Sequence, residues 1–82
     1  MIAVLFFGKM ADLTGRRRLD VAPGAGGDSL LGLRDRVLGE ALAAGRLAEG
    51  DIRMSLNQVA QNTDRPVADG DEVAFFSVFS GG

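Results

Sequence analysis

The side chains that most often perform chemistry in proteins are missing from this sequence. Its 82 residues include no Cys and no His, which excludes a thiol nucleophile, a disulfide framework and the usual zinc ligands. Carboxylates, hydroxyl groups, amines and the chain terminus remain for any chemistry. We therefore predict no metal site, and look for function in residues 69–82, DGDEVAFFSVFSGG, where a strand-like segment runs directly into two glycines.

The proposed functional group is the terminal carboxylate of Gly82. Ser80, Gly81 and Gly82 are expected to form a flexible tail that, with almost no side chains, can enter a narrow channel and approach another protein's backbone. Chain ends are often passive, and a Gly-Gly end can arise by chance in a chain with 12 glycines. The functional tail is favoured because no linker separates it from the hydrophobic strand.

Length and composition predict a single domain over residues 1–82. Apolar residues make up 46% of the chain and charged residues 24%, as in ordinary soluble globular proteins. No apolar run is long enough to span a membrane, and the net charge of −2 argues against a nucleic-acid partner. Absence of cysteine is compatible with the cytoplasm, where we expect the protein to act. Residues 16–18, three arginines, are interpreted as the solvated face of a strand, with contact to an anion or an enzyme as the alternative.

The pattern of apolar residues predicts an α+β fold. Residues 1–7 are continuously apolar, typical of a central strand, and a period of two indicates further strands. One convincing helix should begin after a cap at Asp28 or Ser29 and run to about Ala44, with Gly45 as its stop. Its buried apolar stripe is expected to be Leu30, Leu33, Val37 and Ala41. The expected elements are strands at 1–7, 17–21, 52–57, 58–64 and 72–79, a helical turn at 9–13 and the main helix.

If the last strand lies beside the first, the connection through the helix makes the two parallel and central. The order then predicts a ubiquitin-like β-grasp, a mixed sheet of about five strands with one main helix packed on one face. Alternation along the strands places Ile2, Val4 and Phe6 toward the helix and Phe7, Ala74 and Phe76 on the outer face.

An apolar patch beside a functional tail is typical of a partner surface. The predicted interface residues are Phe7, Phe76, Val78 and Phe79. The alternative is that a bulge or loop of the same chain covers the patch.

Three segments resemble a known family. MIAVLFFGKMADLTG at the start, SLNQ in the third strand and DGDEVAFFSVFSGG at the end are similar to the small subunits of molybdopterin synthase, the MoaD family of sulfur-carrier β-grasp proteins. The likeness covers essentially the whole chain. Family members often carry prolines after the FF pair, whereas this chain has Ser77 and Val78, so its tail is expected to be more mobile. Asn57 matches a strand-end Asn of the family, and we interpret it as a turn side chain bonded to local backbone.

The resemblance implies a mechanism. An adenylating, MoeB-like enzyme would use ATP to activate the carboxylate of Gly82, and a sulfur source would convert it into a thiocarboxylate. Sulfur would then pass to cyclic pyranopterin monophosphate, held by a larger, MoaE-like catalytic subunit. The chain itself would bind no cofactor and would be a non-catalytic donor subunit, which leaves open whether it counts as an enzyme.

Three other functions stay open. The same tail chemistry would serve a sulfur carrier for thiamine or tRNA thiolation. A ubiquitin-like modifier would instead join Gly82 to lysines of other proteins. A plain interaction domain would use the arginine cluster and the phenylalanine patch, and its tail would be inert.

Overall fold

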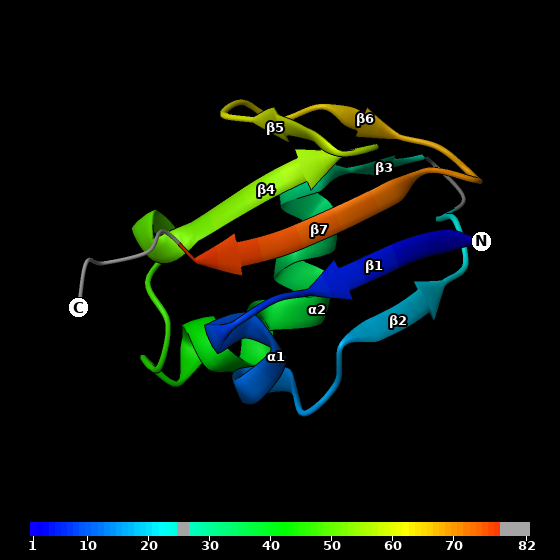
Figure 1. Cartoon of the computed structure of the whole chain (residues 1–82). Helices are drawn as coiled ribbons and strands as arrows, with labels where there is room; N and C mark the ends of the chain where they lie inside the picture. The colour runs from blue at the N-terminus through cyan, green and yellow to red at the C-terminus, as the bar shows by residue number, and fades with distance from the viewer. Residues whose placement is uncertain (25–26, 78–82) are drawn as a thin grey trace.

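The structure is a computed structural model that describes residues 1–24 and 27–77. The strands and helices form two layers, a sheet and the helix packed on it (Figure 1). The elements are β1 (Ile2–Phe6), α1 (Lys9–Thr14), β2 (Arg18–Val21), β3 (Asp28–Ser29), α2 (Leu30–Ala43), a 3₁₀ turn (Glu49–Asp51), β4 (Ile52–Leu56), β5 (Val59–Gln61), β6 (Pro66–Val67) and β7 (Glu72–Ser77).

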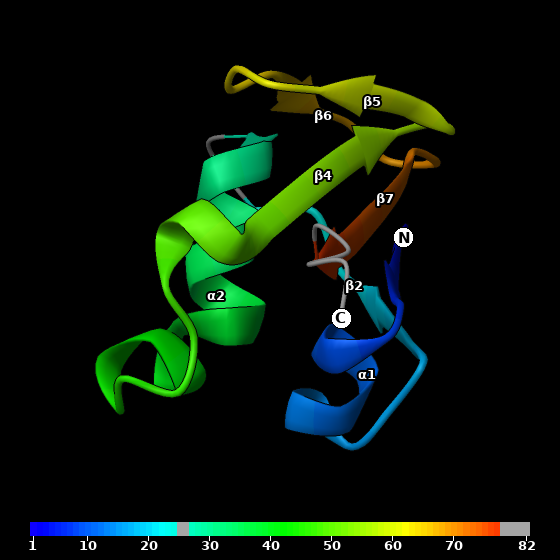
Figure 2. The same ribbon diagram turned by 60° about the vertical axis from the view of Figure 1, so that its left-hand side comes forward.

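Five strands make the main sheet, in the order β2-β1-β7-β4-β5. β1 and β7 pair in parallel, and the other neighbours are antiparallel. Helix α2 covers one face of this sheet, as the turned view makes clear (Figure 2). The predicted β-grasp, with first and last strands parallel at its centre, is therefore confirmed. Within the described residues no helix is long and apolar enough to cross a membrane.

The core lies between the sheet and α2. Alternate residues of the two central strands point into it, since successive side chains of a strand lie on opposite faces. The rings of Phe6 and Phe75 stack with their centroids 6.3 Å apart. Almost completely buried in this core are Ile2, Val4, Phe6, Val73 and Phe75 from the strands and Met10, Leu30, Leu33 and Leu38 from the helices. The predicted inward set of β1 is confirmed, whereas Val37, which was expected in the buried stripe of α2, is only partly buried.

Both helices stop at a glycine in the left-handed region. Gly15 follows α1 with φ of 73°, and Gly45 follows α2 with φ of 74°. Glycine adopts this conformation without the steric cost that a Cβ imposes. The stop predicted at Gly45 is confirmed.

Three hydrogen bonds satisfy the start of α2. The hydroxyl of Ser29 accepts from the N–H of Gly32 at 3.0 Å, as the sequence predicted. The Leu31 N–H instead donates to a carboxylate oxygen of Asp64 at 3.0 Å, and the Leu30 N–H donates to the Arg65 carbonyl at 3.0 Å. The small sheet of β3 and β6 brings this distant segment to the helix. These two partners could not be predicted from the sequence because they lie more than thirty positions away.

Replacing Asp64 should weaken the start of α2. In Asp64→Ala the N–H of Leu31 loses its acceptor, and we expect the free energy of unfolding to fall by about 1 kcal/mol. Urea denaturation followed by circular dichroism measures this change. The exposed neighbour Thr63 serves as the control, and Thr63→Ala should stay within about 0.5 kcal/mol of the parent. Equal effects of the two substitutions would contradict a capping role for Asp64.

Candidate functional site

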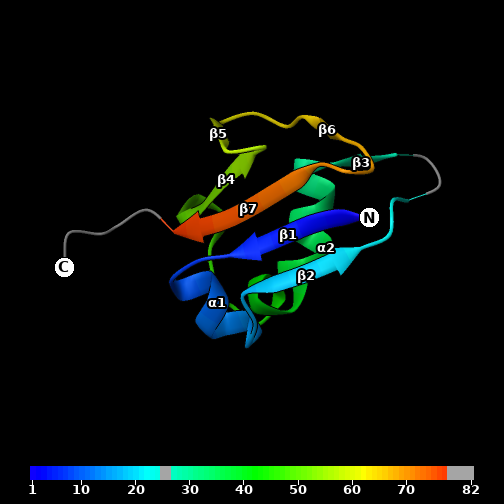
Figure 3. The same ribbon diagram turned by 45° about the vertical axis from the view of Figure 1, so that its right-hand side comes forward.

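Strand β7 directs the chain toward its predicted functional end. It is paired along its length on both sides, in parallel with β1 and antiparallel with β4. Its last residue, Ser77, lies opposite Ile52 of β4. Figure 3 shows β1 and β7 running in the same direction toward one edge of the sheet. The predictions for Val78, Phe79, Ser80, Gly81 and Gly82 lie outside the described residues.

Phe7 lies beside the end of β7. Its backbone N–H donates to the carbonyl of Phe75 at 3.1 Å, which continues the parallel pairing beyond β1. Gly8 then turns the chain into α1 with φ of 55°. Phe7 is 52% exposed, although it directly follows the buried strand β1. Its predicted exposure is confirmed.

Phe76 lies on the outer face of the sheet, away from α2. It is paired with Arg53 of β4 and is partly exposed. Ala74, two residues earlier, faces the same way but is only 7% exposed, because larger side chains of the neighbouring strands surround its single methyl group. Outward orientation along β7 agrees with the predicted alternation, and apolar surface gathers at the end of the strand from which the tail continues.

Two open hollows border this apolar surface. The first, of about 440 Å³, is lined by Arg53, Met54, Ala60, Gln61, Asn62 and Phe76. The second, of about 760 Å³, is lined by Leu5, Phe6, Phe7, Gly8, Ala11, Asp12, Gly15 and the three arginines 16–18. We call Phe7, Phe76 and these two hollows the phenylalanine surface. Within residues 1–24 and 27–77, no segment covers Phe7.

The arginine cluster gives the second hollow a basic border. Arg16, Arg17 and Arg18 are all exposed, which agrees with the prediction of a solvated face. Arg18 pairs with Asp20 at 3.0 Å on the outer side of β2, so part of its charge is compensated locally. In the part of the chain that the structure describes, no three His, Cys, Asp or Glu side chains lie close enough to hold a metal ion.

A hydrogen-bond network fixes the other end of β7. Asn57, in the turn after β4, has φ of 50°. Its N–H donates to the Glu72 carbonyl at 2.7 Å, and its side-chain oxygen accepts from the Glu72 N–H at 2.9 Å. Its amide group donates to a carboxylate oxygen of Asp71 at 3.1 Å. Asn57 is a turn residue as predicted, but the expected local partner was wrong, because the side chain bonds backbone 15 positions away.

Asp71 completes this network. Its second carboxylate oxygen accepts from the N–H of Ala68 at 2.8 Å. This backbone bond, followed by the bond from the Asn57 amide, holds the pKa of Asp71 below its ordinary value. The start of β7 is therefore joined to the turn before it and to the end of β4.

A five-stranded mixed sheet with one covering helix, and a central strand that leads to the chain end, define a ubiquitin-like β-grasp protein. Over residues 4–82 the chain matches the family model described as the ThiS family. The chain belongs to the ThiS family.

Two kinds of relatives agree with this family. The molybdopterin synthase sulfur carrier subunit of Escherichia coli K12 is 37% identical over the whole length of both chains. Among solved structures, SAMP1 from Haloferax volcanii superposes with a TM-score of 0.71 at 27% identity, covering 99% of this chain and 98% of that one. Urm1 from Trypanosoma brucei, at 23% identity, a TM-score of 0.64 and coverage of 99% and 94%, shows the shared fold.

The Asp71 network makes stability depend on pH. Because the folded pKa of Asp71 lies below the unfolded one, its stabilisation is complete above the unfolded pKa and is lost as pH falls through the folded pKa. In Asp71→Asn the amide cannot accept both hydrogen bonds. We therefore expect this variant to be less stable at pH 7 and to lose less further stability than the parent between about pH 5 and pH 2.

Denaturant titrations at a series of pH values measure this difference. Asp12→Asn is a matched control, because Asp12 is exposed and has no side-chain hydrogen bond to any described residue. Its pH dependence should follow that of the parent. If the stability of Asp71→Asn has the same pH dependence as that of the parent, the Asp71 network does not stabilise the folded state as described.

Proposed function

We propose that this chain is a sulfur carrier of molybdenum cofactor biosynthesis and that the carboxylate of Gly82 is its functional group. The observation that carries the proposal is the 37% identity, over the full length of both chains, to a molybdopterin synthase sulfur carrier subunit. The match to the ThiS family also runs through to Gly82. The place of action we propose is the cytoplasm.

The chemistry begins with activation of a poor acyl donor. A carboxylate oxygen of Gly82 attacks the α-phosphorus of ATP in an adenylating, MoeB-like partner, and pyrophosphate leaves. A sulfide sulfur then attacks the acyl carbon, and AMP leaves, which forms a thiocarboxylate. Its sulfur, like a thiolate, is a strong nucleophile at neutral pH.

Sulfur transfer takes place in a second complex. A larger, MoaE-like subunit holds cyclic pyranopterin monophosphate and supplies the catalytic side chains, while the tail brings in the sulfur. After transfer, water at the acyl carbon restores the carboxylate. The carrier binds no cofactor in this scheme. Its contribution is position, and the pairing of β7 on both sides supports that role because it leaves little freedom where the tail begins.

The phenylalanine surface is the proposed docking site for these partners. Phe7 and Phe76, together with Val78 and Phe79 beyond the described residues, would supply an apolar centre next to the tail. Large exposed aromatic residues bordered by hollows are typical anchors of protein interfaces. The 52% exposure of Phe7 supports this assignment.

A second candidate is a ubiquitin-like protein modifier. Similarity to SAMP1 over 99% of this chain favours it. A lysine amine of a target protein, instead of sulfide, would attack the acyl-adenylate of Gly82 and form an amide bond. A carrier for thiamine or tRNA thiolation shares the first steps and differs only in its acceptor.

Intact-mass spectrometry tests the carrier proposal. After incubation with the host's adenylating enzyme, ATP and sulfide, the chain should gain the mass difference between one sulfur and one oxygen, and fragmentation should place it on Gly82. Omission of ATP is the control and should leave the mass unchanged. Unchanged mass in the full reaction, with no acyl-adenylate trapped, would overturn the proposal, and conjugates with other proteins would favour the modifier.

Extension of the tail gives an independent test. One Ala appended after Gly82 displaces the carboxylate from the position at which it must react, so thiocarboxylate formation should fall below detection while the thermal midpoint stays unchanged. An extended chain that still carries sulfur would show that the end at Gly82 is not the reactive group.

Substitution of Phe7 tests the docking surface. Phe7→Ser removes an exposed aromatic ring, and we expect the dissociation constant for the large subunit to rise about tenfold, which corresponds to about 1.4 kcal/mol. Isothermal titration calorimetry measures it. Val59, which is 60% exposed on β5, provides a matched control, and Val59→Ser should change the dissociation constant less than about twofold. Similar changes in the dissociation constant for Phe7→Ser and Val59→Ser would indicate that the large subunit binds a different face.

A further inference from the structure

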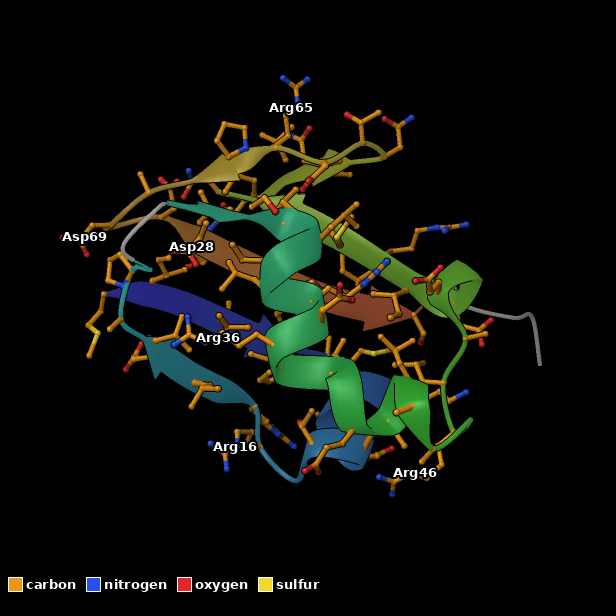
Figure 4. The ribbon with its side chains drawn as sticks, turned by 180° about the vertical axis from the view of Figure 1, so that it is seen from behind. Arg16, Asp28, Arg36, Arg46, Arg65 and Asp69 are labelled. Atoms are coloured by element: carbon orange, nitrogen blue, oxygen red, sulfur yellow. The ribbon has the colours of Figure 1, made fainter. Side chains whose placement is uncertain are left out.

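A groove lies on the other side of the sheet, between β2 and α2. It has a volume of about 430 Å³. Its lining is Phe6, Leu13, Thr14, Arg16, Leu19, Val21, Arg36, Val37, Leu38, Glu40, Ala41 and Arg46. We call it the arginine groove. Seen from behind the sheet, Arg36 extends from α2 toward β2, while Arg16 and Arg46 lie at the lower end of the same region (Figure 4).

The floor of the arginine groove is apolar and only partly covered. Leu19 of β2, Leu13 of α1 and Val37 of α2 pack against the core but are not fully buried. Because the floor of the groove is partly exposed, Val37 is only partly buried, although the sequence predicted it in the buried stripe of α2. An apolar side chain placed here would complete the burial of these three residues.

Strand β2 borders this groove with a free edge, because it is the outermost strand of the sheet. Bonded and non-bonded pairs alternate between antiparallel strands. The Phe6 N–H donates to the Arg17 carbonyl at 2.9 Å, so with the observed register Leu19 and Val21 bond to β1. The N–H and C=O groups of Arg18 and Asp20 therefore point outward, where an added strand would pair with them.

The charge of the groove indicates what kind of peptide strand could pair with β2. Three arginines line the groove against one glutamate, in a chain whose net charge is −2. Arg36 lies 3.9 Å from Asp28 and donates to the Ala22 carbonyl at 3.4 Å, so it is already held over β2. In the described part of the chain, Arg16 and Arg46 have no ion-pair partner. A local excess of positive charge on an acidic protein complements an acidic partner.

We propose that the arginine groove binds an extended peptide of another protein, with an apolar centre and acidic flanks, by strand addition to β2. Peptide backbone pairs with Arg18 and Asp20. Side chains opposite Leu19 and Val21 enter the groove, since paired residues share a face of the sheet. Acidic flanking residues lie against Arg16, Arg36 and Arg46.

The occupant is a different protein rather than this chain. The comparable acidic and apolar segment here, residues 69–76, is engaged in the turn before β7 and in the centre of the sheet. The groove also lies on the face opposite Phe76, so a bound peptide leaves Phe76 free, while Arg16 borders both the groove and the hollow beside Phe7. This inference does not depend on the chemistry proposed for Gly82.

A fluorescein-labelled peptide with a Val-Ile-Val-Ile centre flanked on both sides by Asp tests the proposal. We expect saturable binding by fluorescence anisotropy, and chemical-shift changes at the amides of Arg18, Asp20 and Val37. Arg16→Glu combined with Arg36→Glu should raise the dissociation constant at least about tenfold. Arg65 lies at the far side of the molecule (Figure 4), and the control Arg65→Glu should change the constant less than about twofold.

Changes in the peptide keep the test independent of protein stability. N-methylation of the backbone groups that pair with β2 should abolish binding, and exchange of the flanking Asp for Lys should do the same. Absence of binding, or shift changes at Phe7 and Phe76 instead, would overturn the proposal. Concentration-dependent dimerisation that shifts the β2 amides in the absence of peptide would overturn it as well, because a second copy would then occupy the edge.

Discussion

The parallel pairing of β1 with β7 is the interaction on which the rest of the structure depends. Parallel neighbours cannot be joined by a tight turn, so the chain between them must cross the sheet, and α2 makes that crossing over one face. The inward residues of the two strands, with Phe6 stacked on Phe75, then form the surface on which α2 packs. Loss of this pairing would remove both the centre of the sheet and the base of the core.

Because of this pairing, β1 and β7 run in the same direction and end on the same side of the sheet. Separate hydrogen bonds hold the two ends of β7. At its start, Asn57 holds Glu72 while the N–H of Ala3 donates to the Asp71 carbonyl. At its end, the Phe7 N–H reaches the Phe75 carbonyl. Stability thus comes from backbone bonds and the inward face. Phe7 adds little to the core, which leaves its exposed ring available for a partner.

Features that depend on near neighbours could be predicted from the sequence. The period of two in β7, the Ser29 cap and the glycine stop at Gly45 each follow from a few adjacent residues. Asp64 at the start of α2 could not be predicted in this way, because a cap supplied from so far along the chain exists only once β3 and β6 pair. Ala74 was assigned to the correct face, but its burial depends on the size of its neighbours across two strands.

In the candidate site, too, features set by adjacent residues could be predicted from the sequence, and features set by the fold could not. Exposure of Phe7 followed from strand alternation beside a glycine turn, both visible in the sequence. The arginine groove could not be predicted, because Arg16, Arg36 and Arg46 come from three separate segments of the chain. Only the strand order reveals that β2 is an edge strand. The run of arginines was interpreted as a solvated face, with contact to an anion or an enzyme as the alternative; all three arginines are exposed, but the sequence did not reveal that Arg16 also lines the groove.

Two faces with different chemistry suit the proposed sulfur carrier, whose reactive group would be the single carboxylate of Gly82. In the proposed function, an adenylating enzyme and a sulfur acceptor would each enclose the tail, so they would compete for the surface around Phe7. A partner held in the groove at β2 would lie on the face of the sheet opposite Phe76 and would share only the border at Arg16 with the hollow beside Phe7. The outward N–H and C=O groups of Arg18 and Asp20 at the free edge of β2 can pair with an added strand. An acidic peptide in the groove would pair both with the free backbone groups of β2 and with the three arginines. The proposed carrier would then keep this partner bound while its tail moved between the others.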